Sequence, residues 1–158
     1  MKRHIIQCLV ENKFGVLARV ASLFSARGFN IQSLAVGETH DETMSCLTMV
    51  VKAEDEGILE QIQKQLNKLI DVISVKDITS VDHVEREIIL ARIKYAGKER
   101  EKVDALTEKY SFKMYDVKEN DAVIEYTGSN QRIEELLNDL ADVGIIELVR
   151  SGKIAIST

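Results

Sequence analysis

Two asparagines and a glycine near the start of the chain are residue types that could bind a small zwitterion. Asn12 and Gly15 stand between an alternating apolar run and a helical pattern, so the turn there is expected to expose backbone N–H groups at a helix N-terminus. Such a helix end suits a carboxylate, and glycine lets a ligand approach the backbone closely. The Asn12 side chain offers both an amide N–H and a carbonyl oxygen, so it can meet either the ammonium or the carboxylate of a free amino acid.

A later predicted strand supplies a second amide in apolar surroundings. Asn30 begins that run and is followed by Ile31. Two amides, a free helix end and small aliphatic side chains fit a branched aliphatic amino acid. The candidate ligand-binding residues are therefore Asn12, Gly15, Val16, Leu17, Asn30 and Ile31. The alternative, which spacing alone leaves open, is that Asn12 and Gly15 only make a turn and that Asn30 only follows a helix cap.

No constellation for catalysis or metal binding can be assembled from the rest of the sequence. It contains no phosphate-binding glycine loop, no nucleophile elbow and no His-Glu-x-x-His motif. Cys8 and Cys46 are far apart without Cys-x-x-Cys spacing, and the three histidines are scattered. Each cysteine is interpreted as a small buried hydrophobe. We therefore expect no catalytic residue, no metal site and no cofactor on this chain.

Composition narrows the partners and the compartment. The 158 residues include 26 acidic and 21 basic side chains, for a net charge of −5, and no proline. A net-acidic chain without a basic run is a poor partner for nucleic acid or anionic lipid. The start of the chain is too polar for a signal peptide, and no stretch is apolar for long enough to span a membrane. We expect a soluble, cytoplasmic protein that binds neither nucleic acid nor membrane.

The apolar pattern predicts the same order of elements twice. In the first half, strands are predicted at residues 3–11, 30–39, 43–52 and 72–81, and helices follow the stripes at 16–24 and 58–70. In the second half, strands are predicted at 87–95, 112–117, 122–127 and 145–149, and helices at 98–110 and 133–140. Gly28 is expected to cap the first helix, and residues 152–156 to add a short terminal hairpin.

This order, βαββαβ in each half, predicts an α+β chain of two ferredoxin-like domains, each an antiparallel sheet with helices on one face. The boundary falls in a polar connection near residues 82–86, which contains neither glycine nor proline. The domains are therefore expected at residues 1–81 and 82–158. Domains this small bury a modest share of their surface and leave one sheet face without helices, so association between units is expected.

The candidate turn and four later blocks resemble one known family. Residues 10–20 resemble the opening of an ACT domain, a small βαββαβ module that binds amino acids. Residues 23–34 resemble the family signature Phe-Ser-x-Arg-Gly-(Phe/Tyr)-Asn-Ile-x-Ser-Leu, and residues 61–72, 83–87 and 147–152 resemble later blocks. Because the blocks occur in order from about residue 3 onward, the sequence is similar to the small, regulatory subunits of acetolactate synthase (acetohydroxyacid synthase).

The resemblance implies a regulatory subunit without an active site of its own, built from an ACT domain and a C-terminal ferredoxin-like domain. Such subunits form a homodimer through their ACT domains and activate a large catalytic subunit that uses thiamine diphosphate, Mg²⁺ and FAD. They also confer feedback inhibition by valine or another branched-chain amino acid. The effector lies where two ACT domains meet, so the four candidate residues of the turn would come from one chain, and Asn30 with Ile31 from its partner.

Two positions depart from the family pattern. Relatives often carry proline where Phe14 stands, and their third strand usually shows Ser-Arg where this chain has Ser45 and Cys46. The first difference could alter effector affinity, and the second could alter contact with the catalytic subunit. Two other functions are weighed against this one: an ACT-type amino-acid sensor acting on a different partner, such as a transcription regulator, and a self-sufficient ferredoxin-like enzyme.

Overall fold

The computed structural model describes residues 2–53, 56–115 and 117–158. Contacts between Cα atoms divide the chain into two units, Met1–Val84 with Lys153–Thr158, and Glu85–Gly152. The boundary expected at residue 82 therefore differs from this division chiefly at the C-terminal residues 153–158, which return to the first unit. Each unit is described below by itself.

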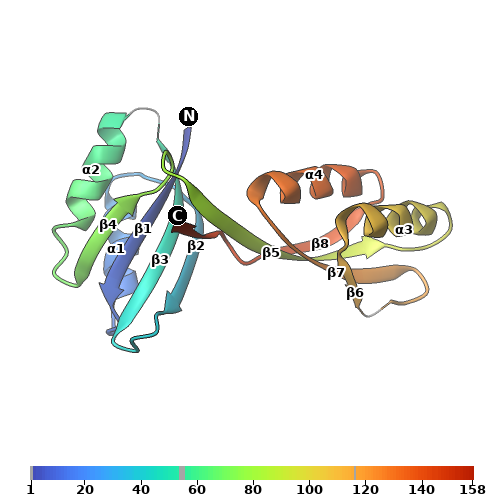
Figure 1. Cartoon of the computed structure of the whole chain (residues 1–158), viewed down its shortest axis with the longest axis horizontal. Coiled ribbons are helices and arrows are strands. Elements are labelled where there is room, and N and C mark those ends of the chain that lie inside the picture. The colour runs from blue at the N-terminus through green and yellow to red at the C-terminus, as the bar shows by residue number, and fades with distance from the viewer. Residues whose placement is uncertain (1, 54–55, 116) are drawn as a thin grey trace. The chain divides into compact units, whose positions relative to one another are not determined.

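The first unit contains the predicted βαββαβ order. Its elements are β1 (Lys2–Glu11), α1 (Val16–Ala26), β2 (Ile31–Glu38), β3 (Met44–Ala53), α2 (Glu56–Leu66) and β4 (Val72–Asp77). The strands form an antiparallel sheet in the order β2-β3-β1-β4, and both helices lie on one face of it (Figure 1). The sheet therefore has one face covered by helices and two edge strands, β2 and β4.

Alternation along the strands separates the two faces of this sheet. Ile6, Cys8 and Val10 of β1 point to the helical side, as their spacing predicts, and join one buried cluster. The apolar stripe of α1 packs into the same cluster through Val20 and Phe24. Gly28 has a φ of 70°, a conformation that glycine adopts without strain, and it follows the end of α1 as predicted.

The second unit repeats the order of elements. They are β5 (His83–Lys94), α3 (Lys98–Tyr110), β6 (Lys113–Tyr115), β7 (Asp121–Gly128), α4 (Asn130–Ala141) and β8 (Ile145–Arg150). The last strand, β9 (Ile154–Ser157), lies within the residues that return to the first unit. The sheet order is β6-β7-β5-β8, and β9 also pairs with β5. The predicted α+β architecture of two ferredoxin-like units is thus confirmed. The predicted terminal hairpin is wrong, because β9 pairs with β5 instead of turning back on β8.

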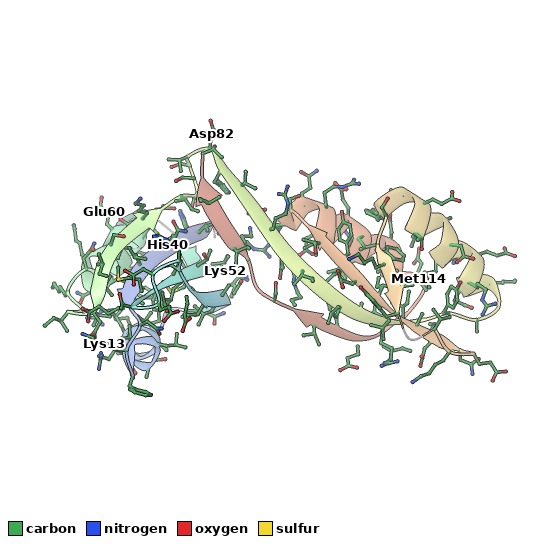
Figure 2. The ribbon with its side chains drawn as sticks, turned by 60° about the horizontal axis from the view of Figure 1, so that its bottom comes forward. Lys13, His40, Lys52, Glu60, Asp82 and Met114 are labelled. Carbon is green, nitrogen blue, oxygen red and sulfur yellow. The ribbon has the colours of Figure 1, made fainter. Side chains whose placement is uncertain are left out.

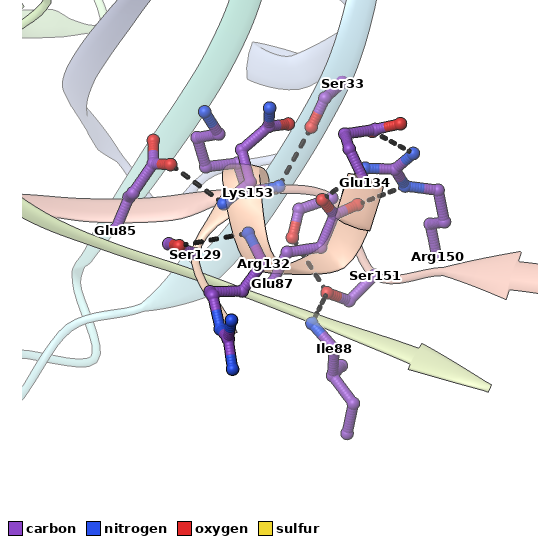
Figure 3. Close-up of polar contacts among 12 residues, drawn as sticks. Ser33, Glu85, Glu87, Ile88, Ser129, Arg132, Glu134, Arg150, Ser151 and Lys153 are labelled. Carbon is purple, nitrogen blue, oxygen red and sulfur yellow. Dashed lines mark hydrogen bonds and ion pairs between the residues drawn. The ribbon is translucent and has the colours of Figure 1, made fainter. Parts of the chain in front are cut away.

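A buried ion pair ties the start of β5 to the end of β8. Both Glu87 carboxylate oxygens accept hydrogen bonds from the Arg150 guanidinium, at 2.8 and 2.7 Å, and a third Arg150 nitrogen donates to Glu134 on α4 at 3.0 Å (Figure 3). Ser151 adds a bond, because its hydroxyl accepts from the backbone N–H of Ile88 at 3.1 Å. This cluster fixes the register of β8 against β5 and the position of α4.

The C-terminal residues lie against the helix-free face of the first sheet. Two hydrogen bonds join them to this sheet: Lys153 N donates to Ser33 Oγ at 2.9 Å and Gln7 Nε2 donates to Ala155 O at 3.1 Å. A third, from Thr158 N to Asp82 O at 2.9 Å, joins the end of the chain to the connection between β4 and β5. Successive residues of a strand point to opposite faces of the sheet. Gln7 lies between Ile6 and Cys8, and Ser33 precedes Leu34; because these neighbours contact the core on the helical side, Gln7 and Ser33 point to the helix-free face. The last strand is therefore part of the first unit's structure.

Candidate functional site

The β1–α1 turn has the geometry of an unblocked helix N-terminus. Gly15 stands at the N-cap with φ 81° and ψ −5°, and no side chain caps the helix. The helical bonding begins with Arg19 N, which donates to Gly15 O at 2.9 Å. The N–H groups of Leu17 and Ala18 precede this bond, so they have no upstream helical carbonyl to bind. In Figure 2, Lys13 marks this turn. The sequence prediction of an anion-compatible helix end at this place agrees with the local geometry.

Asn12 is held in place by the hairpin between β2 and β3. Its side-chain amide donates to Glu38 Oε1 at 3.0 Å and to the Glu42 carbonyl at 2.9 Å, and its backbone N–H donates to the Thr43 carbonyl at 2.7 Å. Both amide hydrogens are thereby used, which leaves the carbonyl oxygen Oδ1 to face a ligand. The sequence left open whether the Asn12 side chain would contact the ammonium or the carboxylate of an amino acid. This arrangement favours the ammonium group, because an oxygen acceptor is what remains.

Arg19 and Asp71 complete the turn, and sequence reasoning missed both. The Arg19 guanidinium lies 2.6 Å from Asp71 Oδ2 in an ion pair, although not along a hydrogen-bond direction. The Asp71 carbonyl accepts from Glu11 N at 2.9 Å, which joins the α2–β4 loop to the end of β1. A Cβ on Gly15 would lie 3.4 Å from the Arg19 guanidinium, so Arg19 folds back over the turn. The only sequence signal was the four-residue spacing from Gly15 to Arg19.

Charge around the turn is balanced by neighbouring acids. Lys13 lies 2.7 Å from Glu11, and the hydrogen bond to that carboxylate raises the pKa of Lys13 above its ordinary value. The lysine therefore stays protonated at neutral pH. Phe14 is fully exposed, so its ring does not hold the turn by packing. The conformation of the turn rests instead on Gly15, Arg19 and the bonds of Asn12.

The structure separates the six candidate residues into two groups. Val16 is buried in the core, so only its backbone faces the turn, while Leu17 is 45% exposed beside it. Asn30 is exposed and Ile31 half-buried, and both follow the other end of α1. The 11 residues of α1 span about 16 Å, so the two groups do not form one pocket within a chain.

The fold and this turn are those of an ACT domain, the class of small βαββαβ regulatory modules. The family model for the ACT domain of the acetohydroxyacid synthase small subunit type matches residues 6–74, and the model for the small subunit of acetolactate synthase matches residues 86–158. The chain belongs to the acetolactate synthase small-subunit family. It is thus a regulatory subunit.

Full-length relatives carry the same assignment. The chain is 44% identical to the probable acetolactate synthase small subunit of Archaeoglobus fulgidus, over 97% of this chain and 95% of that one. It is 45% identical to the acetolactate synthase small subunit of Mycolicibacterium smegmatis, over 98% and 90%. The crystal structure of the small subunit from Thermotoga maritima superposes with a TM-score of 0.88 at 36% identity and covers 100% of this chain and 98% of that one. The resemblance stated from the sequence motifs is confirmed.

The described residues offer neither a cluster of metal ligands nor a membrane-spanning helix. Within residues 2–53, 56–115 and 117–158, no group of three or more His, Cys, Asp and Glu side chains is placed to hold a metal ion. No helix in that part of the chain is long and apolar enough to cross a membrane. Neither finding bears on which molecules the regulatory site binds.

The two cysteines lie on opposite faces of the first sheet. Cys8 pairs with Leu47 and points into the core, whereas Cys46 pairs with Leu9 and points to the helix-free side. Cys8 is fully buried and Cys46 half-buried. The interpretation as a buried hydrophobe is therefore confirmed for Cys8 and holds only partly for Cys46.

This placement predicts unequal thiol chemistry. Burial, with a smaller contribution from Cys46, raises the pKa of Cys8 from 9.0 to about 12. A thiol reagent at about pH 8 is expected to modify Cys46 alone in the native protein and both thiols after denaturation. Because the unfolded thiol ionises near pH 9.0 while the folded one stays neutral, the free energy of unfolding should fall as pH rises from about 9 toward 12. Urea denaturation of Cys8→Ala, measured in parallel, isolates this slope; equal slopes in both proteins would contradict it.

Proposed function

We propose that this subunit activates the catalytic subunit of acetolactate synthase and makes it sensitive to valine or a related branched-chain amino acid. The effector would bind between the first units of two chains, at the β1–α1 turn of one and the Asn30 end of α1 of the other. The thiamine diphosphate, Mg²⁺ and FAD of the reaction would belong to the catalytic subunit. The observation that carries the proposal is the separation of the candidate residues to opposite ends of one helix.

A two-fold dimer would bring those ends together. In a two-fold (isologous) contact, a residue i of one chain meets residue j of its copy, and residue j meets i. Two copies of α1 that pack antiparallel therefore place the N-terminus of each helix beside the C-terminus of the other. Asn12 and Leu17 of one chain would then face Asn30 and Ile31 of the partner subunit. The resulting site would occur twice per dimer.

The edge strand β2 supports this mode of pairing. Its eight residues carry one charge, Glu38, and no proline, so it lacks the features with which natural sheets protect an exposed edge. Because the chain crosses from β1 to β2 over β3, α1 lies on the β2 side of the helix layer. Pairing of two β2 strands would place two copies of α1 side by side.

The orientation of α1 agrees with that arrangement. Arg19 marks the side of the helix that faces the α2–β4 loop, because its guanidinium pairs with Asp71. Leu17 is two residues earlier and so lies about 200° around the helix, on the side toward β2. This placement accounts for an exposed leucine beside the turn: it would contact the effector and the partner chain.

The chemistry of the site matches an aliphatic amino acid. The N–H groups of Leu17 and Ala18 would bind the effector's carboxylate, and Asn12 Oδ1 would accept from its ammonium group. Leu17 and the partner's Ile31 would surround the aliphatic side chain. Effector binding alters catalysis only if it favours one arrangement of the dimer over another, and such couplings are typically about 1–3 kcal/mol.

Asparagine substitutions test the site. Asn30→Ala is expected to weaken valine binding about tenfold or more by calorimetry, because a hydrogen bond to a charged group is lost, and Asn12→Ala to do the same. The reconstituted enzyme should become correspondingly less sensitive to valine. Asn67→Ala, an exposed asparagine of the same unit, serves as the control and should behave as the native chain. Native affinity in both Asn12→Ala and Asn30→Ala would refute the site.

A further inference from the structure

A groove of about 460 Å³ lies between α1 and α2 of the first unit, beside the proposed effector site. Its lining includes two small side chains, Ala18 and Ser22, and two large apolar ones, Leu23 and Leu69; these four residues are called the floor of the groove. Ala18 and Ser22 are four residues apart on the exposed side of α1, so neither blocks the approach of another chain. Hollows between two helices of this kind accept apolar side chains from a partner helix.

The rim of the groove is basic. Arg19, Arg27 and Lys68 line it, and no acidic residue is among its described lining. Arg19 is neutralised by Asp71. Among the described residues, Arg27 donates to the neutral Gln65 side chain at 2.8 Å, and neither Arg27 nor Lys68 forms an ion pair there. This concentration of positive charge stands in a chain whose net charge is −5. The groove is therefore complementary to an acidic, partly apolar segment.

We propose that the α1/α2 groove is the docking site for an acidic, amphipathic helix of the catalytic subunit. The proposal rests on the proposed function, which supplies the partner, and adds the surface that receives it. Apolar side chains of the helix would enter the floor between Leu23 and Leu69, and its carboxylates would meet Arg27 and Lys68.

The groove is on the side of α1 that stays free in the proposed dimer. Arg19 and Leu23 of the groove lie toward α2, whereas Leu17 lies toward the β2 edge, about 200° around the helix from Arg19. Two first units can thus pair through β2 while each presents its groove. The two surfaces would be occupied by different partners.

Arg19 connects the groove to the effector turn. Its guanidinium lines the groove, pairs with Asp71 and lies 3.4 Å from the position of a Cβ on Gly15. An effector carboxylate at the Leu17 and Ala18 amides would lie next to this cation and compete for it. Effector binding would thereby change the charge and shape offered to the catalytic subunit.

Charge substitution in the groove tests the proposal. In Gln65→Glu/Lys68→Glu, a carboxylate replaces the neutral partner of Arg27 and a second replaces a rim cation. The concentration of this subunit that half-activates the catalytic subunit is expected to rise about tenfold or more. Raising salt from about 0.05 to 0.3 M should weaken the native pair and affect the variant less. Calorimetry should show native valine affinity in the variant, because neither residue lies in the turn.

The control is Gln61→Glu/Lys102→Glu, which makes the same charge change at exposed positions outside the groove. It should activate the catalytic subunit as the native chain does. An unchanged half-activating concentration in the groove variant would overturn the inference while leaving the proposed function standing. If sedimentation showed that the groove variant self-associates differently while its activation of the catalytic subunit is unchanged, the groove would bind a second copy of this chain instead. That result would also overturn the inference. A native chain that fails to bind the catalytic subunit would overturn both.

Cross-linking gives a second readout. A zero-length carbodiimide joins a lysine amine to a carboxylate in contact with it, so the native complex should yield a peptide pair that contains Lys68. Lys68→Arg keeps the charge but offers no amine, so it should lose that cross-link and keep activation. The assigned docking site would be contradicted if the same partner peptide were cross-linked only to lysines outside the groove and not to Lys68.

Discussion

Glu87→Ala is expected to lower the free energy of unfolding of the second unit by about 3 kcal/mol. The Glu87 carboxylate is 5% exposed and holds the Arg150 guanidinium through two hydrogen bonds, at 2.8 and 2.7 Å. Those bonds raise the pKa of Arg150 above its ordinary value, so the arginine remains charged when its partner is removed. The variant would retain a partly buried cation whose remaining carboxylate is Glu134.

The chain contains its own probe for this measurement. All of its tyrosines, Tyr95, Tyr110, Tyr115 and Tyr126, lie in the second unit, and it has no tryptophan. Tyrosine fluorescence during urea denaturation therefore reports that unit. Glu134→Ala is the matched control and should cost less than about 1 kcal/mol, because its carboxylate is 45% exposed. Similar small losses in both variants would show that the buried pair contributes no more than a surface one.

Deletion of residues 153–158 is expected to destabilise the first unit by about 2–4 kcal/mol, because three hydrogen bonds worth roughly 1 kcal/mol each are lost with the pairing of β9. Ile5 and Val50, which point to the helix-free face near this segment, are only 6% and 5% exposed in its presence. Native-state hydrogen exchange should show faster exchange of β1 and β3 amides.

The control for the deletion is Ile156→Ala, whose side chain is 64% exposed and whose backbone can keep all of these bonds. It should exchange as the native chain does. Because residues 153–158 belong to the first unit, the deletion should speed amide exchange in β1 and β3. It should have a smaller effect on the urea midpoint that tyrosine fluorescence reports for the second unit. The reverse order of effects would mean that the last strand supports the second unit instead.

Local elements were predictable because their signals are local. The stripe that predicts a helix over 98–110 matches α3, Lys98–Tyr110, and the alternation in β1 places Ile6, Cys8 and Val10 in the core as expected. The strand predicted over 72–81 ends earlier, at Asp77. There the Asp77 carboxylate accepts from Thr79 N at 2.9 Å and starts a turn, which the apolar pattern of the run does not reveal.

The candidate site was predictable in part. The sequence identified the turn through Asn12 and Gly15, since a strand, a glycine and a helical stripe follow in order. It could not identify Arg19 and Asp71 as partners, because the sequence does not show which arginine is paired with which carboxylate, or which aspartate is buried. The side on which Leu17 lies also became clear only once the Arg19 ion pair fixed the rotation of α1.

The sequence by itself determined the order of the elements, the repeated plan and, through blocks in a specific order, the acetolactate synthase small-subunit family. Periodicity and short motifs carry that information because they depend on neighbours a few residues apart. Only the tertiary structure decided that Glu87 binds Arg150, 63 residues away, and that Lys153 donates to Ser33, 120 residues away. Such contacts depend on how the strands are ordered and in what register they pair, and many pairings of these charged and polar side chains are compatible with the same local pattern.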